Sequence, residues 1–236
     1  MSEKESTEMR VCAFMTLPRY ENVLCRNTIQ AALLQLGIPL HTAQGVFYGQ
    51  CMQRLFASAL EVGIEIALTI DFDSMFTGEH IMALLRTLAM RPDIDAVAAI
   101  QARRGGQFPL MTIKGQTQLD WDGKPVQVST AHFGLTAIRL NKVAQMPKPW
   151  FYSIPGEGGN WEDESGKVDD DIYFWHKWKE AGNTIYVDPA VRIGHMEEMV
   201  AIYNDQYEVE HVYPKVWREK QNKASETDVN KDETAD

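Results

Sequence analysis

Apolar residues recur along the first hundred positions in two alternating patterns. Four short apolar runs predict buried strands, at residues 10–16, 38–43, 64–70 and 95–101. Three longer stretches between them carry apolar side chains at helical spacing, at residues 21–36, 50–61 and 77–90. Gly37 and Gly63 follow the first two helices as stops, and Thr77 is a suitable N-cap for the third. This alternation predicts an α/β fold in which helices cover a parallel sheet.

The second half of the chain is less regular. It holds short strand-like pieces, at residues 109–113, 125–128, 134–140, 184–188 and 191–195. A glycine-rich acidic loop, IPGEGGNWEDESGK, precedes one amphipathic helix over Asp170–Ala181. We expect Trp150 and Phe151, before this loop, to pack in the core. Trp161 lies inside the polar loop, where we expect its ring to contact a ligand.

Two carboxylates, Asp71 and Asp73, directly follow the apolar run at residues 64–70. Ligands of α/β proteins bind at the carboxyl ends of strands, which is where this pair is predicted to lie. Adjacent carboxylates coexist when a divalent cation lies beside them, and oxygen ligands suit Mg²⁺ or Mn²⁺. The alternative is structural: Asp71 caps the following turn and Asp73 is solvated.

A second acidic group, Asp169–Asp170–Asp171, begins the helix that follows the acidic loop. Carboxylates there compensate the helix dipole, but three exceed what capping requires, so the surplus predicts a base or a ligand. His195 follows an apolar strand and Gly194. A histidine at such a position is more often structural, yet beside two carboxylates its imidazole would complete a Mn²⁺ site.

Composition narrows the class of protein. The 236 residues are 44 % hydrophobic, enough to bury the core of one large domain. The formal net charge of -10 does not favour binding to duplex DNA. No apolar run reaches the roughly 18 residues of a membrane span, and the charged segment 1–9, predicted to be flexible, is unlike a signal peptide. With three cysteines read as reduced thiols, we expect a soluble cytoplasmic protein with a disordered tail at 219–236.

Together these segments resemble the GT-A-fold glycosyltransferases, specifically the family-2-like group. LTIDFD is similar to their D-x-D strand end, and HFGLTAIRLNKVAQMPKPWF to their glycine-aromatic strand and short helix. DDDIYFWHKWKEAGNTIYVDPAVRIGH resembles their acidic pair, helix and closing Gly-His. The motifs agree in order and spacing over about residues 10–196.

The resemblance implies a single GT-A domain, Rossmann-like, whose mixed central sheet is flanked by helices. A nucleotide-binding half would span about 10–105 and an acceptor-binding catalytic half about 106–196, followed by a C-terminal extension at 197–218. The family transfers a sugar from a nucleotide sugar, here expected to be a UDP-sugar, to a hydroxyl acceptor, with Mn²⁺ or Mg²⁺ as cofactor. The implied enzyme is a glycosyltransferase.

The family's functional residues map onto this chain by motif. Asp73 would ligate the metal directly, and Asp71 would contact the ribose or hold the metal through water. His195 matches a histidine that ligates the same metal in several relatives. Asp171 matches the general base, which predicts inversion at the anomeric carbon. Asp170 stands where the family has Glu, with acceptor binding as its implied role.

Further donor contacts follow from the same resemblance. The implied set is Thr16, Pro18, Arg19, Arg54, Phe72, Phe133 and Gly134. The first three end the first strand, where the family binds the nucleobase and ribose. The alternative for Arg19 is a plain surface arginine and for Arg54 a solvated helical one. His132 replaces a residue that is commonly small in the family.

Two other functions stay open. A nucleotidyltransferase also holds Mg²⁺ with acidic pairs at strand ends, but LPRYEN has no glycine for its phosphate loop. A nucleotide-sugar-binding module would keep the fold without catalysis. The acceptor is open among a glycan, a small molecule and a modified DNA base, since compact enzymes of this kind also occur in viruses.

Overall fold

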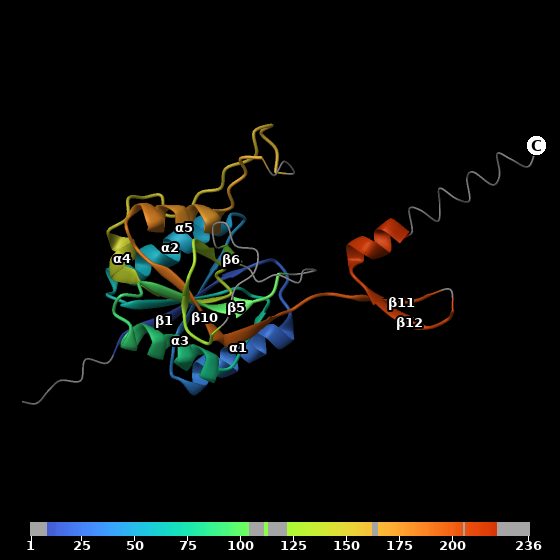
Figure 1. The fold of residues 1–236 in the computed structure, drawn as a ribbon, viewed down its shortest axis with the longest axis horizontal. Helices are drawn as coiled ribbons and strands as arrows, with labels where there is room; N and C mark the ends of the chain where they lie inside the picture. The colour runs from blue at the N-terminus through green and yellow to red at the C-terminus, as the bar shows by residue number, and fades with distance from the viewer. Residues whose placement is uncertain (1–8, 104–110, 113–121, 162–164, 205, 221–236) are drawn as a thin grey trace, which may run out of the picture. The chain divides into compact units, whose positions relative to one another are not determined.

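The computed structural model describes residues 9–103, 111–112, 122–161, 165–204 and 206–220. The chain divides into two compact units, Met1–His195 and Met196–Asp236. The first unit holds a central sheet with helices on both faces (Figure 1). This is the α/β arrangement that the apolar pattern predicts. The predicted flexible N-terminus lies outside the described residues except for its last residue.

The central sheet begins with three parallel strands, β2 (Leu40–Gln44), β1 (Val11–Leu17) and β3 (Ile66–Ile70). It continues with β9 (Leu135–Arg139), β5 (Ala96–Gln101), β10 (Ile185–His195) and β4 (Ser74–Met75). The short strand β7 (Val126–Gln127) also pairs with β10. β9 runs antiparallel to both β3 and β5, so the sheet is mixed. The four strands of the first half therefore run in one direction, as predicted, and β9 from the second half lies between β3 and β5 and makes the sheet mixed, which the family resemblance implies.

Helices cover both faces of the sheet (Figure 1). On one face lie α1 (Val23–Gln35) and α3 (Gly78–Met90), and on the other α2 (Tyr48–Glu61), α4 (Leu140–Ala144) and α5 (Asp170–Glu180). The predicted helices at 21–36, 50–61, 77–90 and 170–181 are confirmed within a few residues at each end. α3 follows Thr77 as predicted, and the Thr77 amide donates a hydrogen bond to His80 Nδ1 at 3.0 Å.

The two faces bury different kinds of side chain. Under α1 and α3 the core is aliphatic, built from residues such as Ile29, Leu68 and Leu84. Under α2, α4 and α5 it is rich in aromatic rings. Trp150 and Phe151 belong to this aromatic cluster and are 3 % and 4 % exposed, which confirms their predicted place in the core.

β10 joins two pieces that the sequence suggests as separate. It runs from Ile185 to His195, and its pairing with β5 shifts register between Asp188 and Arg192. Asp188 is buried and accepts a hydrogen bond from the Thr87 hydroxyl at 2.8 Å. After the shift, the last residues of β10 pair antiparallel with β4, a two-residue strand for which the sequence has no signal. This pairing places the end of β10 beside the turn that follows β3.

The remaining strands form two small sheets. In the first unit, β6 (Met111–Thr112) pairs with β8 (Thr130–Ala131). In the second unit, β11 (Val200–Tyr203) and β12 (Val209–Val212) form an antiparallel hairpin, and residues 214–220 are helical. The predicted tail at 219–236 lies outside the described residues apart from 219 and 220, which belong to that helix.

Candidate functional site

The turn after β3 carries both aspartates of the D-x-D motif. β3 is buried along its whole length, and the chain then turns so that the Ser74 amide donates to the Asp71 carbonyl at 3.1 Å. The Asp73 side chain is nearly buried, with 6 % of the residue exposed, whereas Asp71 is half-buried. The strand ends where the apolar run predicts, so both carboxylates lie at the carboxyl edge of β3.

His195, the last residue of β10, contacts Asp73 although 122 residues separate them. Its Nε2 lies 3.2 Å from Asp73 Oδ2, and its Nδ1 lies 3.0 Å from the Ala102 carbonyl. A carbonyl can only accept, so Nδ1 carries a proton and donates it to Ala102. In the neutral ring, Nε2 then holds a lone pair that faces a carboxylate. This arrangement is favourable only with a proton or another cation between the two groups.

The donor set of this pair suits a divalent ion of the Mn²⁺ or Mg²⁺ type. Two ligands at about 2.1 Å from an octahedral ion, and at right angles, lie about 3 Å apart. The 3.2 Å between His195 Nε2 and Asp73 Oδ2 matches that spacing. Among the described residues, no group of three or more His, Cys, Asp or Glu side chains is placed to hold a metal. An ion here would need further ligands from water or from a bound phosphate.

The second acidic group begins α5 and contacts the start of α2. Asp170 Oδ2 accepts a hydrogen bond from the Gly49 amide at 3.2 Å. A Cβ on Gly49 would collide with Asp170 Oδ1, so glycine is what permits this close approach. Asp169 is exposed and forms an ion pair with Lys167 at 3.6 Å. Asp170 therefore has a structural role, binding a free amide at the start of another helix.

Asp171 has a different environment from its two neighbours. Its Oδ1 accepts a hydrogen bond from the Ile172 amide at 2.8 Å. Burial raises the pKa of the Asp171 carboxyl, and the negative charges of Asp169 and Asp170 raise it further. The Ile172 amide opposes these effects without reversing them. A carboxylate with a raised pKa is a better proton acceptor, as a general base requires.

Tyr48, the first residue of α2, connects the two acidic groups. Burial raises the pKa of its phenol well above the ordinary value, and the charges of Asp71, Asp171 and Asp170 raise it further. Carboxylates from the end of β3 and from the start of α5 thus both raise the pKa of the Tyr48 phenol, which stays neutral. The Tyr48 ring also packs edge-on against Phe151, with ring centroids 6.4 Å apart.

The other predicted donor contacts lie in varied surroundings. Thr16 and Pro18, at the end of β1, are half-buried, and Arg19 is exposed. Phe72 packs against the aliphatic cluster. Phe133 is only 2 % exposed and stacks on Trp175 in the aromatic cluster, so its burial supports a packing role. Direct contact of any of these with a donor stays a prediction, as it does for Trp161, which is 53 % exposed.

Gly134 directly precedes β9 and belongs to a buried polar network. Its amide donates to His132 Nδ1 at 2.9 Å, and His132 Nε2 donates to the Ala99 carbonyl at 2.8 Å. Burial lowers the pKa of His132 to about 4, so its ring is neutral near pH 7. A Cβ on Gly134 would collide with the Gln101 side chain. His132 and Gly134 are therefore bound to each other.

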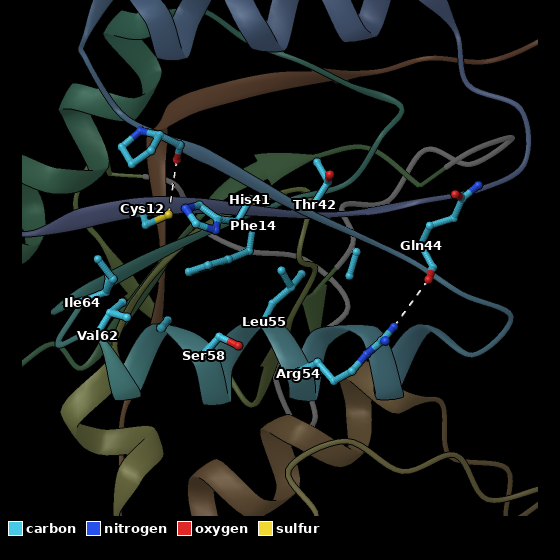
Figure 2. A pocket seen from close by; sticks show the side chains of 13 residues that line it. Cys12, Phe14, His41, Thr42, Gln44, Arg54, Leu55, Ser58, Val62 and Ile64 are labelled. Carbon is cyan, nitrogen blue, oxygen red and sulfur yellow. Dashed lines mark hydrogen bonds between the residues drawn. The ribbon is translucent and has the colours of Figure 1, made fainter.

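Arg54 lies on α2 and lines a pocket of about 450 Å³ between α2 and the edge strand β2 (Figure 2). Its Nη2 donates to the Gln44 carbonyl at 3.4 Å. The rest of the wall includes Phe14, His41, Leu55 and Ser58, and it extends back toward the start of β2. Neither aspartate of the D-x-D motif lines this pocket, so it is separate from the Asp73–His195 contact.

Three residues of the site carry no clear signal in the sequence. Tyr48 is one aromatic residue among several at the start of a helix. Gln101 resembles a solvated residue at the end of a strand, yet it is 1 % exposed and hydrogen bonds beside the Asp73–His195 pair. Cys25 of α1 is fully buried, and the charge of Asp73 adds to burial in raising the pKa of its thiol. Burial and position identify all three, and both depend on the tertiary fold.

Comparison with known proteins bears on the fold. No protein-family model and no curated sequence matches the chain. The crystal structure of A197 from STIV is similar, with a TM-score of 0.57 at 13 % identity over 86 % of this chain and 94 % of A197. The structure of GalNAc-T7 with UDP, GalNAc and Mn²⁺ has a TM-score of 0.47 at 10 % identity, over 81 % of this chain and 44 % of that protein. The fold is GT-A-like, which confirms the predicted fold class.

Within the described residues, each helix is too short or too polar to cross a lipid bilayer.

Proposed function

We propose that this protein is a metal-dependent glycosyltransferase that moves a sugar from a nucleotide sugar, most simply a UDP-sugar, to a hydroxyl acceptor. One observation carries the proposal: the 3.2 Å contact between Asp73 Oδ2 and His195 Nε2 at the carboxyl edge of the sheet. The GT-A-like fold and the motifs that resemble family-2-like enzymes support the same function.

The orientation of the His195 ring is the one that a metal site requires. The Ala102 carbonyl holds the proton on Nδ1, which leaves Nε2 as the atom that faces Asp73. Metal-binding histidines commonly donate the other ring N–H to a carbonyl in this way. Asp73 and His195 would hold Mn²⁺ or Mg²⁺ directly, and Asp71 would hold it through water or contact the ribose.

The ion, when bound, would stabilise the charge that develops on the departing diphosphate. Asp171 would take the proton from the acceptor hydroxyl while that oxygen forms a bond to the anomeric carbon. The bond from that carbon to the diphosphate oxygen breaks in the same step, so the configuration is inverted. The raised pKa of Asp171 suits this proton transfer.

Asp170 would act by holding α5 against α2. Its hydrogen bond to the Gly49 amide fixes the start of α5, and this bond would keep the neighbouring Asp171 in place. The Tyr48 phenol, neutral among the same carboxylates, can donate a hydrogen bond to one of them without adding charge. The acceptor remains open among a glycan, a small molecule and a modified nucleobase.

The direct test is calorimetric titration of the protein with UDP, with and without MnCl₂. We expect Mn²⁺ to strengthen UDP binding at least about tenfold, because phosphate oxygens complete the ligand set of the ion. A screen of nucleotide sugars for Mn²⁺-stimulated donor hydrolysis would then identify the donor. Binding of UDP that is indifferent to Mn²⁺ would contradict the proposal, and binding without any sugar turnover would favour a non-catalytic module.

A further inference from the structure

Gln101 is the last residue of β5 and is almost completely buried, with 1 % exposed. Its Nε2 donates two hydrogen bonds, to Ser74 Oγ at 3.0 Å and to the Gly194 carbonyl at 3.2 Å. Ser74 directly follows Asp73, and Gly194 directly precedes His195. One side-chain amide therefore binds the immediate neighbours of both members of the Asp73–His195 pair.

The strand pairing that brings these neighbours together is short. β4 and β10 pair over only two positions, Gly194 with Met75 and His195 with Ser74. A two-residue ladder contributes few hydrogen bonds, so it fixes the separation of the strands weakly by itself. The two bonds from Gln101 Nε2 join β4, β5 and β10 at this point and add to the ladder.

The residue that follows β5, Ala102, acts on the same pair through its main chain. The Ala102 carbonyl accepts the hydrogen bond from His195 Nδ1 at 3.0 Å, which orients the ring. The end of β5 thus supports the Asp73–His195 contact twice, once through the Ala102 carbonyl and once through the Gln101 side chain. Outer groups of this kind set the orientation of metal ligands, and losing one typically weakens metal binding by about 10–100-fold.

The amide oxygen of Gln101, Oε1, indicates that this side chain does more than fill space. Its Oε1 is buried and has no hydrogen-bond partner within the described part of the chain. A buried acceptor without a partner destabilises the fold, and an apolar side chain of similar size would avoid that cost. Gly134 leaves the space that Oε1 occupies, since a Cβ there would collide with it. The fold therefore accommodates an amide at position 101, and the atom of this amide that binds neighbouring strands is Nε2.

We propose that Gln101 is a positioning residue, which holds β4 and β10 together so that Asp73 and His195 stay at the separation one cation requires. This inference rests on the metal site in the proposed function. It assigns Gln101 no contact with the ion or the substrate, because its polar atoms bind protein groups beside the two ligands.

The experiment replaces Gln101 with Met, which keeps the volume and removes the amide. The matched control is Gln53→Met, because Gln53 Oε1 accepts a comparable long-range hydrogen bond from the Trp150 amide at 2.7 Å, away from the pair. Two readouts are compared with the wild type: the imidazole ¹⁵N and N–H signals of His195 without metal, and the affinity for Mn²⁺ in the presence of UDP, followed by electron paramagnetic resonance.

We expect Gln101→Met to broaden or shift the His195 Nδ1–H signal and to weaken Mn²⁺ binding about tenfold, while Gln53→Met changes neither. If Gln101→Met does not fold, Ser74→Ala removes one of the two acceptors and should weaken Mn²⁺ binding about threefold. The inference is overturned if Gln101→Met, or Ser74→Ala in its place, leaves both readouts at wild-type values. It is also overturned if Gln53→Met changes them as much.

The metal-free signal separates this inference from the proposed function. If the wild-type protein binds no Mn²⁺ with UDP, the proposed function fails. The His195 signal then decides the positioning role alone: a signal that is broadened or shifted in Gln101→Met and unchanged in Gln53→Met supports this role, and an unchanged signal in Gln101→Met overturns it.

Discussion

The two acidic groups of this protein lie in different kinds of surroundings. At the end of β3, Asp73 faces an imidazole ring whose other nitrogen is bound to a carbonyl of β5. At the start of α5, Asp170 binds a main-chain amide of α2, and Asp171 is half-buried beside two other carboxylates. The first group pairs a carboxylate with an imidazole nitrogen, whereas the second leaves one carboxylate with a raised pKa.

This difference supports the separate roles that we propose for the two groups. A nitrogen lone pair next to a carboxylate favours a positive ion, so the first group suits charge stabilisation. Like charges and burial disfavour the ionised form, so the second group suits proton transfer. The Tyr48 phenol stays neutral, because burial and the charges of carboxylates from both groups raise its pKa.

The largest effect that separates the two groups should come from Asp171→Asn. Asn cannot take the acceptor proton, so we expect transfer to fall about a thousandfold, while Mn²⁺-dependent UDP binding is unchanged. The measurement is the rate of transfer, or of donor hydrolysis, with the nucleotide sugar found in the screen. Asp169→Asn is the control: the Asp169 carboxylate is exposed, and losing its charge removes only one contribution to the raised pKa of Asp171, so we expect a far smaller fall in rate. Wild-type turnover by Asp171→Asn would contradict the base assignment.

The reverse pattern is expected for Asp73→Asn. Losing the carboxylate should weaken binding of Mn²⁺ in the presence of UDP by at least about tenfold, because the amide oxygen carries no charge to offset the ion. Calorimetric titration measures this affinity. Asp170→Asn, in the other acidic group, should leave it within about twofold. Equal losses of Mn²⁺ affinity in Asp73→Asn and Asp170→Asn would contradict the proposal that only the first acidic group binds the metal.

Gly49→Ala tests the contact between α2 and α5. The new Cβ would collide with Asp170 Oδ1, so we expect the free energy of unfolding to fall by about 1–3 kcal/mol in urea titrations. In an Asp170→Ala background the same substitution should cost much less, because the colliding atom is absent. If Gly49→Ala lowers the free energy of unfolding equally with Asp170 and with Ala at position 170, the Asp170 side chain is not what excludes a Cβ at position 49.

The smallest effect is a gain in stability from Asp171→Asn near pH 7. Because folding raises the pKa of Asp171, the folded state binds more protons than the unfolded state between the two pKa values, and stability falls as pH rises through that window. Asn removes this loss, so we expect a small gain in the free energy of unfolding at neutral pH. The gain should disappear as pH falls below the ordinary pKa of Asp. Thermal unfolding at several pH values measures it, and a loss of stability at pH 7 would contradict it.

Much of the fold could be predicted from local patterns. Helical periodicity and stop residues locate α1, α2, α3 and α5 because each buries one apolar stripe. β10 was predicted as two pieces, because Pro189 interrupts the apolar run and prolines are rare inside strands. The structure places Pro189 in the irregular stretch where the register with β5 shifts, so one strand continues past it. β4 was missed, since two residues carry no periodicity.

The candidate site was predictable where a motif carried the chemistry. Asp71, Asp73, Asp171 and His195 stand out as acids or a histidine at the ends of regular elements. Gln101 does not, because a glutamine at the end of a strand is usually solvated, and only the packing of β4 and β10 buries it. Tyr48 is missed for a similar reason, since its partners among the carboxylates come from β3 and α5.

The sequence by itself determined which segments become strands and helices, and it placed carboxylates at the end of β3 and at the start of α5. Periodic burial and capping act over a few residues, so they can be read from the order of the chain. Only the tertiary structure decided that Asp73 meets His195, and that the end of β5 supports both. That contact depends on a register shift in β10 and on a two-residue pairing with β4, which arise when strands far apart in the sequence pack into one sheet.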